Sequence, residues 1–360
     1  TATAEAEWSE GLIRSWTAAG WMKLPSTVGD RIAPLIGAGP GEVVVGDSTS
    51  VNLFKCLAAA LELRCGRRVI LAEADNFPTD NYIAEGLVGL SGDRIVRYAA
   101  TDEPIADSLD DNVAVLVLSH IHYRTALIQD MGAVTAAAHA AGALVLWDLS
   151  HSAGVLPVDL GGADVDFAVG CTYKYLNGGP GAPAYTYVSP RLVGRTRQPL
   201  AGWLGHADPF AFAPDYRPGV AIKRFICGTP QVLSLAALDE SLKLWADVDL
   251  PDLRTKAMRM TELFIAAVEA SCGRQALDLA VPRDAVRRGN HVSFSHPHGY
   301  RVMRALIERG IIGDFRAPDI IRFAFAPLYL TYADAVRAAA ELARVLDQEL
   351  WNDPRFAVRA

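Results

Sequence analysis

Short apolar runs alternate with longer helical patterns through the first half of this 360-residue chain. The predicted strand and helix pairs are Glu42–Val45 with Val51–Arg64, Arg68–Ala72 with a helix from about Thr79, and Val113–Leu118 with Gly132–Ala141, followed by a strand at Leu144–Trp147. This alternation predicts βαβ units, and therefore an α/β fold whose mostly parallel sheet is covered by helices on both faces. In such sheets, ligands bind beyond the carboxyl ends of the strands.

The pattern changes from about residue 231 onward. Long helices are predicted over Gln231–Ala246 and Leu253–Ser271. Strands are then expected near His291–Ser295 and Ile320–Phe325, before a closing helix from Tyr332. This mixture predicts a second, smaller α+β domain.

Charge, cysteine content and hydropathy exclude several classes of protein. The chain has 34 Lys and Arg against 41 Asp and Glu, a net charge of −7, and no basic tract, which argues against nucleic acid as a partner. Its 5 scattered cysteines form no CxxC pair, as is typical of reduced thiols. Acidic residues (Glu5, Glu7 and Glu10) occupy the place of a signal peptide, and the longest uncharged stretch, Met131–Trp147, is too short to span a membrane. We therefore expect a cytoplasmic protein that binds small molecules, not a membrane.

Polar residues follow four of the predicted strands, at the point where each strand ends. These clusters are Gly46–Ser50, Ser119–His120, Asp148–His151 and Gly170–Lys174, the last of which follows a further apolar run that ends at Val169. Because the carboxyl ends of parallel strands meet at one edge of a sheet, the four clusters are expected to converge there.

Three of these clusters carry groups that suit one cofactor. The hydroxyls of Ser48, Thr49 and Ser50 lie at a helix start, where a phosphate would be held; the alternative is a plain N-cap, which needs only one hydroxyl. Asp148 ends an apolar strand, where its carboxylate needs a cationic or N–H partner such as a ring nitrogen, unless it forms a helix cap or turn. Lys174 has uncharged neighbours and suits a Schiff-base nucleophile, the alternative being an exposed loop lysine. Together they match the needs of pyridoxal 5′-phosphate (PLP).

Two further patterns are weaker. His120 with His122, and His296 with His298, have spacings that a metal could use, but they lack nearby Cys or paired carboxylates, so no metal site is expected. Gly178–Gly181 lacks the Lys-Ser/Thr of a nucleotide-binding loop. We interpret it as a turn beside the lysine segment.

These motifs resemble those of the bacterial-type kynureninases, PLP-dependent enzymes that hydrolyse kynurenine to anthranilate and alanine in tryptophan degradation, the kynurenine pathway and NAD biosynthesis. The likeness runs from Gly11 to Tyr329, and its motifs are Asp47–Lys55, Phe77–Asp80, Trp147–Ser152, Cys171–Gly181 and Gly202–His206. The resemblance implies the fold-type-I (aminotransferase class V-like) architecture and a homodimer with active sites at the subunit interface. With it, the chain divides into a large PLP-binding domain, residues 41–244, and a small domain formed by residues 1–40 and 245–360.

The resemblance also implies roles for individual residues. Lys174 would carry PLP as a Schiff base, Asp148 would pair with the pyridinium nitrogen, and Phe77 would stack on the ring. Tyr173 is the candidate for relaying a proton to the substrate's β-carbon. Arg322 matches the family's arginine for the substrate α-carboxylate, the alternative being a surface salt bridge. The other implied cofactor contacts are Thr49, Ser50, Pro78, Thr79, Asp80, Ser119, His151, Trp203 and Thr229.

Three positions of the sequence bear on substrate preference. Trp21 and Thr229 match ring-contacting positions that favour unsubstituted kynurenine over 3-hydroxykynurenine, with Trp21 reaching the partner's site; the alternative for Trp21 is a packed core aromatic. His122 stands where relatives carry Asn, so a ring-substituted kynurenine of secondary metabolism stays an alternative. So does another fold-type-I reaction, such as that of a cysteine desulfurase or β-lyase, which needs a mobile catalytic cysteine. A non-enzymatic relative would be expected to lose Lys174, Asp148 or Arg322, and all three are present.

Overall fold

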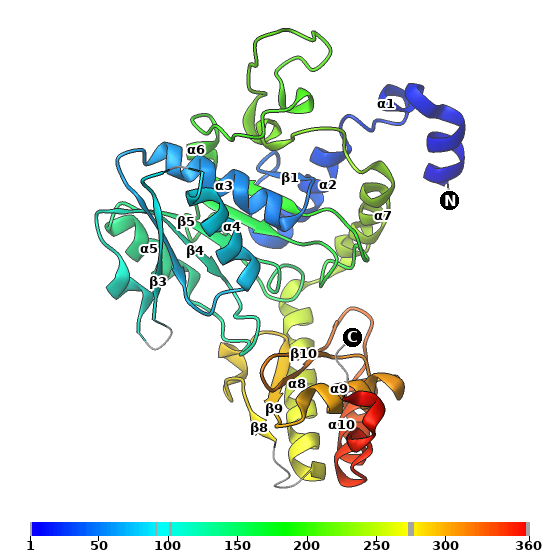
Figure 1. Cartoon of the computed structure of the whole chain (residues 1–360). Helices are drawn as coiled ribbons and strands as arrows, with labels where there is room; N and C mark the ends of the chain where they lie inside the picture. The colour runs from blue at the N-terminus through cyan, green and yellow to red at the C-terminus, as the bar shows by residue number, and fades with distance from the viewer. Residues whose placement is uncertain (1, 91, 101–102, 273–276, 358–360) are drawn as a thin grey trace. The chain divides into compact units, whose positions relative to one another are not determined.

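The computed structural model describes residues 2–90, 92–100, 103–272 and 277–357. The chain divides into two compact units (Figure 1). The first comprises the residues up to His120 together with Gln129–Val248, and the second comprises Ile121–Ile128 together with the residues from Asp249 onward. Within the described ranges, no helix is both long enough and apolar enough to cross a membrane.

A seven-stranded sheet forms the centre of the first unit, in the order β1-β7-β6-β5-β4-β2-β3. Its strands are β1 (Val43–Val45), β2 (Val69–Glu73), β3 (Ile95–Ala99), β4 (Val113–Ser119), β5 (Leu144–Asp148), β6 (Phe167–Gly170) and β7 (Tyr185–Val188). The neighbouring strands β3, β2, β4, β5 and β6 are parallel, whereas β7 pairs antiparallel with both β6 and β1. The predicted α/β class and mostly parallel sheet are confirmed, and β1 runs in the same direction as β6.

Helices cover both faces of this sheet. The helices of the first unit are α1 (Ser15–Ala18), α2 (Leu24–Ile32), α3 (Thr49–Leu63), α4 (Pro78–Val88), α5 (Met131–Ala140), α6 (Pro190–Val193) and α7 (Val232–Lys243). Leu57 of α3 and Leu87 of α4 pack in one apolar cluster with Leu146 of β5. The next residue, Trp147, points to the opposite face, because side chains alternate along a strand, and its Nε1 donates to Thr135 Oγ1 of α5.

The second unit is an antiparallel sheet packed against helices. Its strand order is β10-β11-β9-β8. The elements are α8 (Leu250–Cys272), β8 (Asp278–Leu279), β9 (His291–Ser295), α9 (Gly299–Glu308), β10 (Asp314–Arg316), β11 (Ile320–Ala324) and α10 (Tyr332–Asp347). Phe264 of α8 lies 4.9 Å from Phe323, ring centroid to ring centroid, inside the core. The predicted α+β character of this part of the chain is therefore present.

The observed division differs from the predicted domain boundaries at residues 1–40. These residues group with the large unit, because α2 packs on β1 and on α7. Gly29 permits the close approach: a Cβ at this position would lie 2.2 Å from the carbonyl oxygen of Val43. The predicted break at residue 244 falls within a 3₁₀ turn, Leu244–Asp247, that stays with the first unit.

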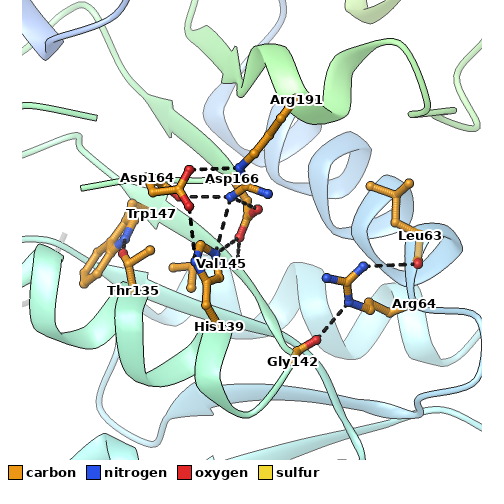
Figure 2. A network of polar contacts seen from close by, with 10 residues as sticks. All are labelled: Leu63, Arg64, Thr135, His139, Gly142, Val145, Trp147, Asp164, Asp166 and Arg191. Atoms are coloured by element: carbon orange, nitrogen blue, oxygen red, sulfur yellow. Dashed lines mark hydrogen bonds and ion pairs between the residues drawn. The ribbon is translucent and has the colours of Figure 1, made fainter. Parts of the chain in front are cut away.

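A polar network ties the first unit together where the chain enters β6 (Figure 2). The fully buried carboxylate of Asp166 accepts hydrogen bonds from the Val145 N–H at 2.8 Å and from His139 Nε2 at 2.8 Å. Arg191 Nη2 lies 2.5 Å from the other carboxylate oxygen, and Arg191 Nε also pairs with the exposed Asp164 at 2.9 Å. Because Asp166 precedes β6, the network lies at the amino ends of the parallel strands.

Replacing Asp166 with Asn is expected to lower the free energy of unfolding by about 2 kcal/mol. The amide has one oxygen in place of two, so its NH₂ group would face N–H groups of Val145, His139 or Arg191 that need an acceptor. Urea denaturation of the full chain would measure this. Asp164→Asn is the matched control: it alters an exposed partner of the same Arg191 and should cost less than about 1 kcal/mol. Equal losses in the two variants would contradict a special role for the buried carboxylate.

Candidate active site

A cavity of about 670 Å³ lies in the first unit, where the chain leaves β1, β5 and β6. The last residues of β1 and β6, Val45 and Gly170, are both register partners of Tyr185 at the start of β7. This pairing places the segments that follow the two strands at the same edge of the sheet. The lining residues are Asp47–Val51, Leu53, Phe77, Thr79, Asp80, Asp148, Ser150, Cys171, Tyr173, Lys174, Gly181–Ala184 and Gln231.

Three of the four predicted polar clusters therefore contribute to the cavity. The fourth does not line it. Ser119 is the register partner of Asp148, but its N–H and its hydroxyl both donate to the side-chain oxygen of Asn76, at 3.2 and 2.7 Å. His120 packs edge-on against Trp147, and burial lowers the pKa of its imidazole to about 4, so it is neutral at physiological pH.

The amino end of α3 forms one end of the cavity wall. Ser48 has an extended backbone and is the N-cap, its Oγ accepting from the Val51 N–H at 3.3 Å. Capping accounts for this hydroxyl, whereas those of Thr49 and Ser50 are additional polar groups on the cavity wall. The first turn of a helix also presents backbone N–H groups and the positive end of the helix dipole. This end of the cavity suits an anion such as a phosphate.

Lys174 lies in the loop between β6 and β7, beside two aromatic rings. Its Nζ is 6.0 Å from the centroid of the Phe77 ring and 5.8 Å from that of Tyr173. Phe77 immediately precedes α4. An amine is thereby placed beside apolar ring surface in a cavity that can admit a flat ligand.

Two buried carboxyl groups lie on the same cavity wall. Asp148 is 5% exposed and its Oδ1 accepts from the Ser150 N–H at 2.8 Å. Burial raises the pKa of Asp148, while the nearby Lys174 ammonium and hydrogen bonds from Ser150 oppose that rise. Burial, and then the charge of Asp148, hold the pKa of Asp80 well above its usual value, with Lys174 again opposing the rise.

These side chains fit PLP. Asp80 Oδ2 is buried and has no hydrogen-bond partner among the described residues, so one polar atom of this pair of carboxyl groups is left for a ligand. A protonated pyridine nitrogen would supply a hydrogen-bond donor and a positive charge that compensates Asp148. The Thr49–Ser50 helix start suits the phosphate, and Lys174 suits the aldehyde. The three chemical parts of the cofactor thus have counterparts around one cavity.

The remaining predicted cofactor residues lie elsewhere in the first unit. Pro78 is the first residue of α4, between two lining residues, and His151 follows the lining residue Ser150. Thr229 lines a small neighbouring hollow of about 20 Å³. Trp203 lines a separate surface hollow with Trp16. Their predicted contacts with the cofactor stay predictions.

Trp21 is buried in its own chain. Its Nε1 donates to a carboxylate oxygen of Glu7 at 2.9 Å, and its ring packs edge-on against Trp16 with centroids 5.8 Å apart. These contacts match the alternative of a packed core aromatic. A contact between Trp21 and substrate stays a prediction.

Sequence reasoning gave no individual role to several lining residues. Asp47, Ser150 and Cys171 belong to the strand-end clusters and motifs, so their location was available as a signal. Gln231 precedes α7, far along the chain from the other lining residues, and no local pattern marks it.

Arg322 lies in the second unit, on β11, and its side chain is mostly buried. Its Nε donates to Asp314 Oδ1 at 2.9 Å, its Nη2 to Asp314 Oδ2 at 2.5 Å, and its Nη1 to the Tyr123 carbonyl at 2.5 Å. A guanidinium has five N–H groups, and these contacts use three of them. In the same unit, His122 Nδ1 accepts from the Thr125 N–H at 3.1 Å.

Known proteins resemble this chain along almost its whole length. A family described as the kynureninase C-terminal domain matches residues 253–342. The kynureninase of Deinococcus radiodurans is 54% identical over 347 residues, which cover 95% of this chain and 84% of that protein. The kynureninase of Burkholderia pseudomallei (strain K96243) is 50% identical over 361 residues, covering 99% of this chain and 86% of that protein.

Solved structures with the same fold are more distant in sequence. A cystine C–S lyase in complex with its product, cysteine persulfide, has a TM-score of 0.80 at 18% identity, covering 95% of this chain and 90% of that one. A mutant of that lyase, with glycine covalently linked to its PLP cofactor, has a TM-score of 0.79 at 18% identity, covering 95% and 89%. The apo cysteine desulfurase of Thermococcus onnurineus NA1 has a TM-score of 0.77 at 16% identity, covering 92% and 86%. At these identities the likeness establishes the fold-type-I architecture, and the activities of these proteins do not transfer.

Proposed function

This chain belongs to the kynureninase family, and from that membership we propose how its own residues carry out the reaction. It is a PLP-dependent hydrolase that acts on a carbon–carbon bond, cleaving L-kynurenine between Cβ and Cγ to give anthranilate and L-alanine. The single observation that supports the residue assignments best is the convergence of Lys174, the two buried carboxyl groups and the α3 start around one cavity.

The cleavage consumes one water molecule: the γ-carbon gains the hydroxyl group that makes anthranilate a carboxylate, and the β-carbon gains a proton. PLP, when bound, accepts the electron pair released at the substrate's α-carbon. Lys174 would hold the cofactor through Nζ and then move the proton at the α-carbon. Asp148 would keep the ring nitrogen protonated, since a buried carboxylate is stabilised by a cationic donor. Phe77, on the cavity wall, would stack on the ring.

Other residues would hold the phosphate and manage the second proton. Thr49 and Ser50 are proposed to bind the phosphate, together with the N–H groups of the first turn of α3. Tyr173 is half exposed on the cavity wall beside Lys174 and would deliver the proton to the β-carbon. Pro78, Thr79, Asp80, Ser119, His151, Trp203 and Thr229 complete the proposed cofactor contacts.

Arg322 is proposed to bind the substrate α-carboxylate. Asp314 holds one edge of the guanidinium in a bidentate contact, which fixes the plane of the group. Burial of the side chain further limits its rotamers. The N–H groups that these contacts do not use would serve the carboxylate.

Arg322→Lys is expected to raise the KM for kynurenine about 10- to 100-fold, with a smaller effect on kcat. A lysine ammonium lacks the planar pair of N–H groups that a guanidinium offers to the substrate carboxylate. Steady-state kinetics would measure the change. Arg316→Lys alters another arginine that pairs with Asp314, at 3.2 Å, and serves as the control. A KM for Arg322→Lys within twofold of the wild-type value would contradict the assignment.

We propose that unsubstituted kynurenine is the preferred substrate, on the residue types at Trp21 and Thr229. The His122 position keeps ring-substituted kynurenines as the alternative. Trp21 is buried in its own chain, and the resemblance implies that it acts on the substrate ring in the partner subunit's site. The ratio of kcat/KM for kynurenine to that for 3-hydroxykynurenine decides between the two.

We further propose that the enzyme is a homodimer. A surface hollow of about 540 Å³ in the first unit is lined almost entirely by apolar side chains. Ile13 and Phe212 on this hollow are 80% and 78% exposed. Exposed apolar surface of this kind is typical of protein interfaces, and a second copy of the chain is the proposed occupant.

The five free thiols support a reducing, cytoplasmic location.

Phe212→Asp is expected to shift the enzyme from dimer toward monomer, because it places a charge in an apolar interface. Sedimentation velocity at several protein concentrations would measure the shift. Ile312→Asp is the control, since Ile312 is 84% exposed but belongs to the second unit. A Phe212→Asp variant as dimeric as the wild type would place the interface elsewhere.

The function is tested by mixing purified protein with PLP and kynurenine. Bound cofactor should colour the protein yellow, and borohydride should trap the cofactor on the chain. Anthranilate, measured by its fluorescence, should form in the same amount as alanine. Cofactor binding without anthranilate, but with alanine formed from cysteine and with sulfide released when a thiol reductant is added, would favour the desulfurase alternative. Failure to bind PLP at all would contradict the enzyme assignment.

A further inference from the structure

Lys55 is a buried charge in the middle of α3 and has no part in the mechanism above. The residue is 1% exposed. Its Nζ donates to Asp47 Oδ2 at 2.6 Å, to Asn52 Oδ1 at 3.0 Å and to the Phe225 carbonyl at 2.8 Å. An ammonium group has three N–H donors, so these acceptors satisfy all of them. Burying such a charge is costly unless it is paired, and here the partners are fully provided.

The charged partner of Lys55 is Asp47, which lies in the turn between β1 and the amino end of α3. Its φ is +55°, in the left-handed region that is unfavourable for most residues other than glycine. Main-chain bonds hold it on one side: the Ala184 N–H donates to the Asp47 carbonyl at 2.9 Å, and the Gly46 N–H donates to the Ala184 carbonyl at 2.8 Å. On the other side, its carboxylate is held by Lys55. A strained turn persists where its surroundings hold it in this way.

Asp47 also lines the same cavity wall as Thr49 and Ser50. An uncompensated carboxylate at this place would repel a phosphate dianion bound at the start of α3. The Lys55 ammonium offsets that charge from behind, without itself lining the cavity. The Cys227 thiol interacts with both groups, and burial raises its pKa, so it adds no negative charge.

We propose that Lys55 is a positioning residue for the cofactor phosphate. It neutralises Asp47 and holds the turn that presents the Thr49 and Ser50 groups, and it does so without touching the phosphate. The inference rests on the proposed binding of the phosphate at the start of α3.

The first test is Lys55→Met in the full chain, with the dissociation constant for PLP measured by equilibrium dialysis of the apoenzyme. We expect PLP to bind at least tenfold more weakly. Pyridoxal, which lacks the phosphate, should bind the variant and the wild type within threefold of each other. Lys243→Met is the control, because Lys243 is exposed on α7 and pairs with Glu240 and Asp239. Its PLP affinity should match that of the wild type.

The second test is the double variant Asp47→Asn with Lys55→Met, which removes both charges. Asn tolerates a left-handed backbone well, so the turn should persist, and PLP affinity should return to within threefold of the wild-type value. This variant leaves no unpaired charge, so it stays informative where Lys55→Met alone fails to fold.

Three results would overturn the inference: unchanged PLP affinity in Lys55→Met, an equal loss of affinity for pyridoxal and PLP, or a double variant as weak as the single one. Wild-type protein that fails to bind PLP in the same assay would instead refute the proposed function, so the two failures are distinguishable.

Discussion

Lys174→Ala is expected to abolish kynurenine cleavage, with kcat falling by about 10⁴-fold or more. A positioned acid–base group alone contributes about 10²–10⁴-fold, and Lys174 is also proposed to hold the cofactor covalently. Its place in the cavity supports both tasks, because Nζ lies within about 6 Å of the Phe77 and Tyr173 rings. No other lysine lines this cavity in the described part of the chain.

The measurement is anthranilate fluorescence at saturating kynurenine, together with borohydride reduction followed by mass spectrometry. Wild-type protein should carry the reduced cofactor on the peptide that contains Lys174, and the variant should carry none. Lys243→Ala, on the exposed face of α7, should behave as the wild type. A Lys174→Ala variant with near-native turnover would refute the assignment of this lysine.

Asp148→Asn is expected to lower kcat by about 10²–10³-fold, the loss typical of removing one preorganised electrostatic contact. The reason is the difference between a carboxylate and an amide in a buried place. A carboxylate stabilises a protonated ring nitrogen, whereas a neutral amide of the same shape does not. The amide keeps the volume of the side chain, so the cavity should keep its form.

Two controls separate this effect from general damage. Asp111→Asn alters an exposed carboxylate and should leave kcat unchanged. Asp80→Asn alters the second buried carboxyl group, whose uncharged form is already favoured by burial and by the charge of Asp148. The decrease in kcat should therefore be smaller for Asp80→Asn than for Asp148→Asn. Kinetics of the three variants at one pH would decide. If Asp80→Asn were the more damaging change, the two carboxyl groups would have to exchange roles.

Much of the fold follows from local patterns in the chain. The predicted strand at His291–Ser295 matches β9 residue for residue, and the helix predicted from Tyr332 begins there as α10. The helix expected from Val51 begins two residues earlier, at Thr49, with Ser48 as its cap. Apolar periodicity and capping residues are local properties, so a sequence displays them directly.

Other parts of the fold depend on pairings that no local pattern encodes. Residues 1–40 were expected with the small domain, yet α2 packs on β1 and α7 of the large unit. Residues 121–128 belong to the second unit, although in the sequence they lie between β4 and α5 of the first unit. Amphipathic segments need an apolar partner, but their sequence does not say which one they obtain.

The same distinction applies to the site. By itself, the sequence identified Lys174, Asp148 and the Ser48–Ser50 helix start, because each lies at the end of a recognisable strand and carries a functional group that suits PLP. Tertiary structure decided that Asp80 joins Asp148 as a second buried carboxyl group, and that the Ser119 hydroxyl donates to the side-chain oxygen of Asn76.

Tertiary structure also decided that the buried Lys55 is satisfied by the Phe225 carbonyl, 170 residues away in the chain. Which groups are buried together, and therefore which charges must compensate one another, depends on contacts between distant segments. Such contacts form only when the sheet is assembled, because burial is a property of the packed chain and not of any short stretch of it.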